Sequence, residues 1–329
     1  MKNIRRYLGL ALLLFLVGII SSCFKDDLSK ADSEGTATVT LHINDSRSGE
    51  TSTVEAGEGI KTLRVIVLDA ENKVEFNYKQ SFGNETDPQI EKTVTFLGMT
   101  TGIKKFYVVA NEESLGLMED GYPAKGTPVN NPDDLLNKVI TDTGRSHFPK
   151  LKGEITSLPV TGYKEVQITA DTKNITIETF HAVAKIVFKV KNTSSEDITL
   201  TGFSLGEFFA DQTYLFPSAT GQLTGVNYAP FVGTVNRTFT AGAAEAEYFT
   251  CYLYETPEDR KSYFTVKLLS DLGLEEKAVT ISDYVVKRNT VINIVATISK
   301  ETSVIVPNID LEWQVSPWNS VTNNVPSFN

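Results

Sequence analysis

The chain has 329 residues, of which 41% are hydrophobic and 22% charged, as in ordinary globular proteins of about two domains. Acidic residues outnumber basic ones by 41 to 31, and the net charge of −10 argues against a nucleic-acid partner because phosphate would be repelled. Two cysteines and three scattered histidines exclude a disulfide scaffold and give little support to a metal site or a histidine-activated nucleophile. We therefore expect a protein without cofactors.

The first 22 residues have the pattern of a signal peptide. Three basic residues precede an apolar stretch at 7–20, which is shorter than the ~20 residues that a membrane-spanning helix needs. The stretch ends in Ile-Ser-Ser-Cys, which resembles a bacterial lipobox, so Cys23 is expected to be acylated and to become the first residue. Residues 24–27 (FKDD) resemble the signal that sends lipoproteins of the Bacteroidetes to the cell surface. A lipid-anchored precursor in the cell outer membrane is therefore predicted.

The rest of the chain is predicted to be all-β. Short segments rich in Val, Ile, Thr, Phe and Tyr alternate with clusters of Gly, Asn, Asp and Pro. Because no helices alternate with these segments, they indicate antiparallel β-sandwiches, and one short helix is expected at 132–141 after a cap at Asn131 or Asp133. The predicted strands lie at 37–43, 62–68, 91–97, 104–109, 165–169, 175–179, 184–190, 198–205, 244–254, 262–269, 276–281, 289–298 and 309–315.

A polar loop at 171–174 is the predicted boundary between two domains, because it is followed by a new run of strands. The expected units are a lipidated propeptide with the first strand (23–47), an N-terminal sandwich (48–173), a C-terminal sandwich (174–302) and a C-terminal tail (303–329).

Four short blocks occur in a fixed order along the body of the chain. They are 102–112 (GIKKFYVVANE), 181–186 (HAVAKI), 214–217 (YLFP) and 286–290 (VKRNT). Together they resemble the Bacteroidales fimbrillins, in which the first is an "fyvvANe" strand and the second opens the second domain. His181 stands where those proteins usually have an Arg. Each block alone is a generic strand, and only the ordered set is specific.

The resemblance implies two transthyretin-like, Greek-key β-sandwich domains with an extended C-terminal tail. It also implies a structural subunit, a stalk or accessory pilin, of a cell-surface fimbrium that supports adhesion. Such subunits are joined to other fimbrial subunits by strand exchange, after maturation by an Arg-specific surface protease.

Strand exchange requires a first strand that leaves the precursor, so that an extended segment of a neighbour can take its place. Ala37, Val39, Leu41 and Ile43 alternate with polar residues, which is the pattern expected of a half-buried edge strand. These four residues are the predicted displaced strand, although any half-buried strand would show the same alternation.

The expected cleavage site lies just after this strand. Residues 44–59 contain three glycines and Val54 as the only large apolar side chain, a composition typical of an exposed loop where proteolysis concentrates. The resemblance makes Arg47-Ser48 the predicted bond, against the alternative that Arg47 is an ordinary solvated residue. Arg145 is a weaker candidate, because a cut there would not free a terminal strand, and Arg64 should be protected within a strand.

The predicted donor strand lies in the C-terminal tail. Ile309, Leu311, Trp313 and Val315 alternate with polar residues and are larger than the four residues lost, so exchange should bury more area, at ~25 cal/mol per Å2. Trp318 follows them, and tryptophans often anchor interfaces. The alternative is that this segment is the last strand of the second domain.

Other functions remain as alternatives. A subunit that retains its lipid would be a fimbrial anchor, a subunit without a recipient would be a tip, and a surface lipoprotein could bind glycan or host protein without polymerising. Catalysis is not expected, because the carboxylate pairs at 112–113 and 275–276 are best read as solvated loop charges. Asp69, Asn72 and Asp87 lack the spacing of a calcium loop, so no metal is expected.

Overall fold

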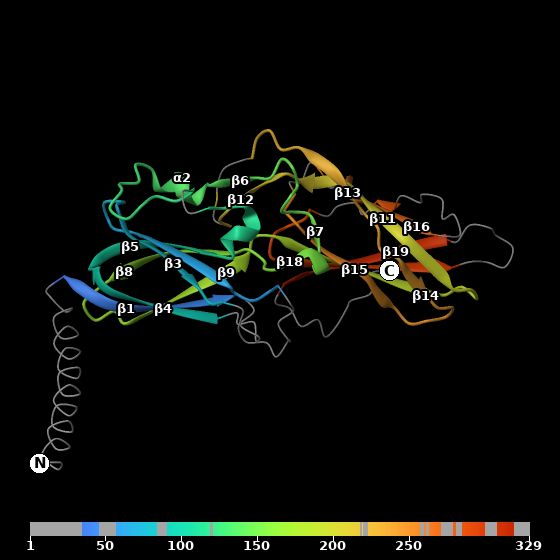
Figure 1. The fold of residues 1–329 in the computed structure, drawn as a ribbon, viewed down its shortest axis with the longest axis horizontal. Coiled ribbons are helices and arrows are strands. Elements are labelled where there is room, and N and C mark those ends of the chain that lie inside the picture. Colours follow the sequence, from blue (N-terminus) through green and yellow to red (C-terminus); the bar gives the residue numbers. More distant parts are fainter. Residues whose placement is uncertain are drawn as a thin grey trace, which may run out of the picture.

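The fold is almost entirely β-structure, which confirms the all-β prediction (Figure 1). The computed structural model describes residues 35–45, 57–83, 91–118, 121–217, 219, 223–256, 260, 263–270, 279–280, 285–299 and 308–318. The strands form two sandwiches arranged along the long axis of the molecule, each with a hydrophobic core of its own.

The N-terminal sandwich is a seven-stranded sheet that folds over on itself. Side chains from both ends of the sheet meet in one core. The sheet turns between residues 160–168 and 174–181, because these two strands pair only at Val160–His181 and Thr161–Phe180. At this corner a Cβ on Gly162 would lie 2.6 Å from the carbonyl oxygen of Glu178, so glycine allows the two halves to approach. The strand order is β3 (Val74–Ser81), β2 (Thr62–Leu68), β5 (Gly102–Ala110), β8 (Val160–Ile168), β9 (Asn174–His181), β1 (Thr36–Asp45) and β4 (Glu91–Thr100).

Strands β2 and β5 are buried on both faces, which explains their nearly continuous apolar sequences. Leu63, Val65 and Val67 of β2 pack into the sandwich core, whereas Ile66 and Leu68 face a second cluster on the outside of the sheet. A strand covered on both faces loses the apolar–polar alternation that a half-buried strand keeps.

The outer face is covered by the long connection between β5 and β8. The predicted helix is shorter than expected: only α2 is helical, and Asn131 caps it by accepting a hydrogen bond from the backbone N–H of Asp133. The end of the predicted helix is a strand instead, because β6 pairs with β12 (Gln212–Tyr214). The elements of the connection are η1 (Glu112–Leu115), α2 (Pro132–Leu136), β6 (Val139–Thr141), β7 (Lys150–Leu151) and η3 (Lys152–Glu154).

The C-terminal sandwich consists of two sheets. The first has the order β19 (Asn308–Pro317), β18 (Thr290–Ser299), β10 (Ala184–Asn192), β15 (Ala246–Leu253) and β7. The second has the order β13 (Tyr228–Gly233), β11 (Ile198–Ala210), β16 (Thr265–Ser270) and β17 (Val279–Thr280), with β14 (Arg237–Phe239) also on β11.

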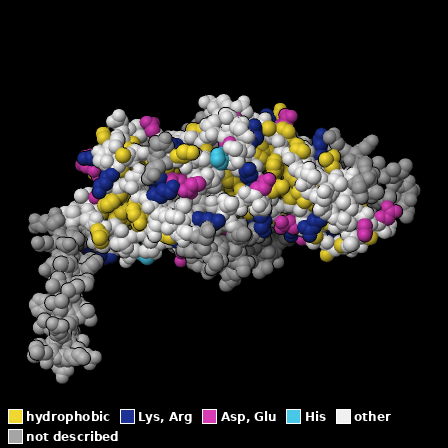
Figure 2. All heavy atoms as spheres, in the orientation of Figure 1, with side chains coloured by type: hydrophobic (Ala, Val, Ile, Leu, Met, Phe, Trp, Pro, Cys, Tyr) yellow, Lys and Arg dark blue, Asp and Glu magenta, His cyan; other side chains and the backbone are white. Residues whose placement is uncertain are grey.

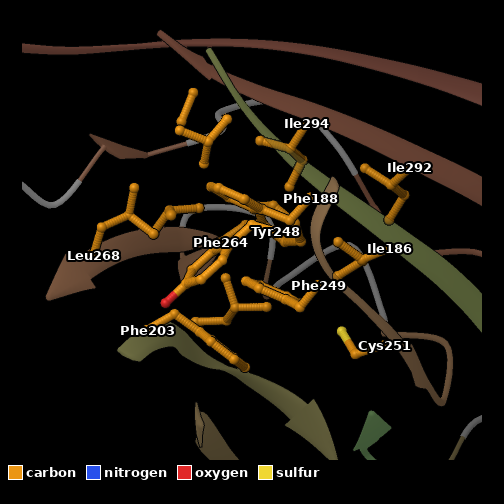
Figure 3. Packing of buried hydrophobic residues seen from close by; sticks show 14 of the residues in the cluster. Ile186, Phe188, Phe203, Tyr248, Phe249, Cys251, Phe264, Leu268, Ile292 and Ile294 are labelled. Carbon is orange, nitrogen blue, oxygen red and sulfur yellow. The ribbon is translucent and has the colours of Figure 1, made fainter. Parts of the chain in front are cut away.

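Aromatic stacking fills the core between these two sheets (Figure 3). The ring of Phe249 stacks on Phe203 at a centroid distance of 3.8 Å and on Phe188 at 5.1 Å. Cys251 lies in the same core, and burial raises the pKa of its thiol well above the ordinary range. The cysteine is therefore a packing residue.

The chain enters the second sandwich between β9 and β10, at residues 182–183, and not at the predicted boundary of 173–174. Strand β9 pairs with β1, and its Ile175 and Ile177 lie in the N-terminal core. The polar segment that suggested a linker is the turn between β8 and β9, closed by the N–H of Thr172 donating to the carbonyl of Thr169. Turns and linkers have the same composition, so the sequence alone did not separate them.

Candidate assembly site

Strand β1 holds the four residues predicted to form the displaced strand. Ala37, Val39, Leu41 and Ile43 are all 0% exposed and point into the N-terminal core, whereas the intervening residues are half-buried. Burial of a side chain the size of Val, Leu or Ile stabilises a fold by about 1.5–3 kcal/mol, so the three larger ones contribute about 5–9 kcal/mol as an upper estimate. The strand is therefore a substantial part of this sandwich.

The expectation that this strand lies at the edge of a sheet is wrong. Strand β1 runs antiparallel to β4, from Thr36 opposite Thr100 to Asn44 opposite Glu91, and parallel to β9 on its other side (Figure 1). Sequence alternation reports which face of a strand is buried and not how many neighbours it has. Removal of β1 would leave a slot with backbone donors and acceptors on both sides.

The segment predicted to be the donor strand is paired within its own chain. Strand β19 runs antiparallel to β18 over its whole length, from Asn308 opposite Ser299 to Pro317 opposite Thr290. It forms one edge of the five-stranded sheet, so residues 308–317 are the last strand in the described part of the chain and not an unpaired extension.

The large side chains of β19 are only partly covered. Leu311 and Val315 are half-buried against the C-terminal core, and Trp313 is 40% exposed. Ile309 pairs with Ile298 in the ladder, and its side chain lies outside the described part of the chain. The alternating pattern is thus present, but the strand is less deeply buried than β1.

Trp318, just after β19, lies at the junction of the two sandwiches. It is 7% exposed, and its ring stacks on His181 at a centroid distance of 4.1 Å and an angle of 6°. The sequence marked Trp318 as an anchor for a partner and His181 only as a departure from the family pattern. The structure brings the two together within one chain, and the unusual histidine was the signal that could have pointed to this contact.

Cys23, Arg47 and Ser48 lie outside the described residues, so their predicted roles as lipid attachment site and cleavage site remain predictions.

Arg145, the weaker cleavage candidate, is held in a tight turn. Its backbone has φ 49°, and the Asp142 carboxylate accepts the backbone N–H groups of Ser146 at 2.9 Å, His147 at 2.8 Å and Phe148 at 3.0 Å. A protease needs an extended segment, and the residues of this turn are partly exposed but not extended.

Arg64 is buried, as its place in a strand suggested. Its side chain makes a bidentate ion pair with Glu112, with Nε 2.7 Å from Oε2 and Nη2 2.9 Å from Oε1, and it donates to Asn77. Lys79 approaches the same carboxylate at 2.8 Å. The reading of residue 112 as a solvated charge is therefore wrong, whereas Glu113 is half exposed beside Lys79.

The charge of Glu112 is fixed by this cluster. Burial alone would raise the pKa of its carboxyl, but the hydrogen bonds from Arg64 and Lys79 outweigh burial and hold the pKa below the ordinary value. The two ion pairs of the buried Glu112 connect the segment after β5 to β2 and β3, so this carboxylate stabilises the fold.

Asp69 and Asn72, which lack the spacing of a calcium loop, make hydrogen bonds in and beside the turn between β2 and β3. Asp69 accepts the N–H groups of Glu71 and Lys73, and Asn72 accepts a hydrogen bond from Lys105. Asp87 lies outside the described residues. Within the described ranges, no group of three or more His, Cys, Asp or Glu side chains could hold a metal.

The surface carries charges of both signs. Figure 2 shows acidic and basic side chains interspersed on one face, with apolar side chains gathered over the region of β13. In the part of the chain that the structure describes, no helix is both long enough and apolar enough to span a membrane.

Comparison with known proteins places these features in a family. The family described as "Major fimbrial subunit protein (FimA)" matches residues 37–260, more than half of the chain. The match begins within β1 and ends beyond β15. None of the curated proteins matches the chain in sequence.

Solved structures share the fold at low sequence identity. A fimbrilin (fimA) from Porphyromonas gingivalis W83 is 15% identical with a TM-score of 0.54, and the match covers 88% of this chain and 99% of that one. A candidate cell adhesion protein from Bacteroides eggerthii DSM 20697 is 15% identical with a TM-score of 0.56, covering 86% and 96%. Another from Parabacteroides distasonis ATCC 8503 is 10% identical with a TM-score of 0.53, covering 88% and 99%. At these identities the likeness shows the fold.

Proposed function

Because this chain belongs to the family of major fimbrial subunit proteins (FimA), a structural and not an enzymatic family, we propose how it reaches the fimbrium and assembles there. As a fimbrial subunit it assembles with other subunits at the cell surface. The proposal is that it is a stalk or accessory subunit, exported as a lipoprotein, cleaved after Arg47 and joined to its neighbours by strand exchange, in support of adhesion.

The observation that carries the proposal is the position of β1. It ends at Asp45, two residues before Arg47, so a cut after Arg47 would leave β1 held by noncovalent contacts alone. Its loss would open a slot between β4 and β9, lined by the apolar residues that now pack on Ala37, Val39, Leu41 and Ile43. A strand with the same alternation and larger side chains fits such a slot.

The tail of another copy meets these requirements. Leu311, Trp313 and Val315 lie at alternate positions of β19 and are only partly buried in their own domain. Transfer into the deeper slot of a neighbour would bury more of their surface, at ~25 cal/mol per Å2. The same transfer would cost the pairing with β18, so the gain comes from the side chains.

Export and anchoring rest on the N-terminal sequence. Acylation of Cys23 would hold the precursor on the outer membrane, and an Arg-specific surface protease would then release the lipid together with β1. The 24–27 signal supports transport of the lipidated chain to the outer surface.

The pairing of β19 with β18 favours a second candidate. A subunit whose last strand stays in its own sheet, and whose β1 stays in place, would be a lipid-retaining anchor or a surface lipoprotein that binds glycan or host protein without polymerising. This candidate keeps the family, fold and lipid but has no cleavage step.

The test is the N-terminus and intact mass of the protein taken from the cell surface. We expect a chain that starts at Ser48 without lipid, and loss of this product in Arg47→Ala but not in the matched variant Arg145→Ala. A chain that starts at acylated Cys23 and retains β1 would overturn cleavage and support the anchor.

A further inference from the structure

The end of the C-terminal strand touches the N-terminal sandwich through one aromatic side chain. Trp318 stacks on His181, the last residue of β9, at 4.1 Å, and on Tyr252 of β15 at 5.9 Å. Among the tail residues whose side chains are described, 310–318, Trp318 is the only large apolar one that is buried. Within the described part of the tail, the most deeply buried apolar side chain therefore lies just after β19, at Trp318.

Asn289 ties the same three segments together through the backbone. Its side-chain oxygen accepts the N–H of His181 at 3.2 Å, its own N–H donates to Val183 at 2.9 Å, and its carbonyl accepts the N–H of Trp318 at 3.0 Å. Asn289 has φ 54°, a conformation that asparagine tolerates better than most residues. The end of β9, the residue before β10 and the residue after β19 thus meet at Asn289.

A buried ion pair completes the surroundings of the indole ring. Lys185 Nζ lies 5.7 Å from the centroid of Trp318 and 3.3 Å from Oε1 of Glu58. Both side chains are largely buried, and Glu58 belongs to the segment that leads into β2. A cation over an indole face is attracted to it, and more strongly where water is excluded. The N-terminal sandwich therefore contributes both Glu58 and His181 to the site.

We propose that His181, Lys185, Tyr252 and Asn289 form a latch that holds Trp318 and keeps β19 closed on its own domain. The strand becomes available to a second copy of the chain only after Trp318 has left the latch. This regulatory role rests on the proposed function, because it concerns the same tail that is proposed as the donor.

Apart from Trp318, β19 is held by its ladder with β18 and by side chains that are only partly buried. As an edge strand it has one neighbour within the described residues, and Leu311 and Val315 are only half-buried. Edge strands with few buried contacts open locally more often than central strands. Loss of the contacts of Trp318 should therefore release the strand without unfolding the sandwich.

The first measurement is hydrogen exchange on the purified full chain, comparing Trp318→Ala with Trp313→Ala. Both variants remove a tryptophan from the same tail, but Trp313 is 40% exposed and lies outside the latch. We expect the amides of β19 to exchange ~10-fold faster or more in Trp318→Ala, with the core amides of β10 unchanged as evidence that the domain stays folded. Wild-type exchange rates in Trp318→Ala, or equal acceleration in both variants, would overturn the latch.

A second measurement separates the latch from donor function. Oligomer formation of the protease-trimmed protein is followed by size-exclusion chromatography for the wild type and both variants. Faster exchange with faster oligomer formation in Trp318→Ala supports latch and donor together. Faster exchange without any oligomers supports the latch and shows that this tail is not the donor. If the β19 amides of Trp318→Ala exchange at the wild-type rate, the latch is overturned whether or not oligomers form.

Discussion

At the scale of single residues, the most consequential side chain outside the two terminal strands is Glu112. It is 1% exposed and is shared by Arg64 and Lys79, and the Arg64 guanidinium lies 4.7 Å from the ring centroid of Tyr122. These contacts fix the connection after β5 to β2 and β3. Removal of one partner of a buried ion pair is costly because the other charge stays buried.

We expect Glu112→Gln to lower the free energy of unfolding by about 3 kcal/mol, measured by urea denaturation. The matched variant is Glu113→Gln, whose carboxylate pairs with the same Lys79 but is 49% exposed, and its effect should stay below about 1 kcal/mol. Equal losses in the two variants would show that burial of the pair is not what matters.

The same carboxylate gives a dependence on pH. Its pKa is lowered in the folded state, so its contribution to stability is complete above the unfolded pKa, near 4.5, and is lost as the pH falls through the folded value. The pKa of Asp142 is lowered as well: burial opposes this, but the backbone N–H groups of residues 146–148 outweigh it.

The urea stability of the wild type should therefore fall as the pH drops below about 4.5, and the fall should be shallower in Glu112→Gln. If the urea stability of the two proteins fell equally steeply below about pH 4.5, the Glu112 carboxyl would have the same pKa in the folded and unfolded states.

At the scale of elements, β1 tests how a strand's sequence relates to its place in the sheet. Its alternation correctly indicated which four residues face the core, because side chains on a strand alternate strictly. It did not reveal the second neighbour, because the alternation is the same whether a strand is paired along one edge or along both.

We expect Leu41→Ala to destabilise the full chain by about 2–5 kcal/mol, since Leu41 is 0% exposed, with Thr40→Ala as the matched change on the other face costing less than about 1 kcal/mol. The measurement is chemical denaturation before and after protease trimming. If β1 leaves on cleavage, the difference between Leu41→Ala and wild type should vanish in the trimmed protein. A difference that persists would show that β1 remains bound.

Three further features could not be predicted from the sequence: β7, the buried outer face of β5 and the contact of Trp318 with His181. Strand β7 has two residues, too few for any periodic pattern, yet it joins the C-terminal sheet beside β15. The apolar run of β5 suggested a strand but not its second buried face, because the covering residues come from the irregular connection after β5 and from the C-terminal half, where no periodic pattern marks them. Trp318 was recognisable as an anchor, whereas its partner His181 became apparent only in the folded chain.

At the scale of the whole molecule, the two sandwiches are interlocked. A third cluster of buried side chains includes Tyr107 of β5 together with Phe216 and Tyr252 from the C-terminal half. Two ladders, β6 with β12 and β7 with β15, cross the junction, and Arg288 donates to the Tyr214 carbonyl at 2.8 Å beside it.

Thermal unfolding of the full chain should therefore show one calorimetric transition and not two. Phe216→Ala removes a ring that contacts Tyr107 across the junction, so we expect the transition to broaden or split, as measured by differential scanning calorimetry. Phe188→Ala, within the C-terminal core, is the control and should lower the melting temperature of the single transition without splitting it. Two resolved transitions in the wild type would contradict a shared core.

The interlocked junction also has a mechanical consequence. A subunit whose halves share buried side chains and backbone ladders resists hinging at its middle, because bending there would have to open both. In a fimbrium pulled by flowing liquid, bending would then be confined to the joints between subunits. The fibre would behave as a chain of rigid rods, with its compliance set by the intersubunit contacts.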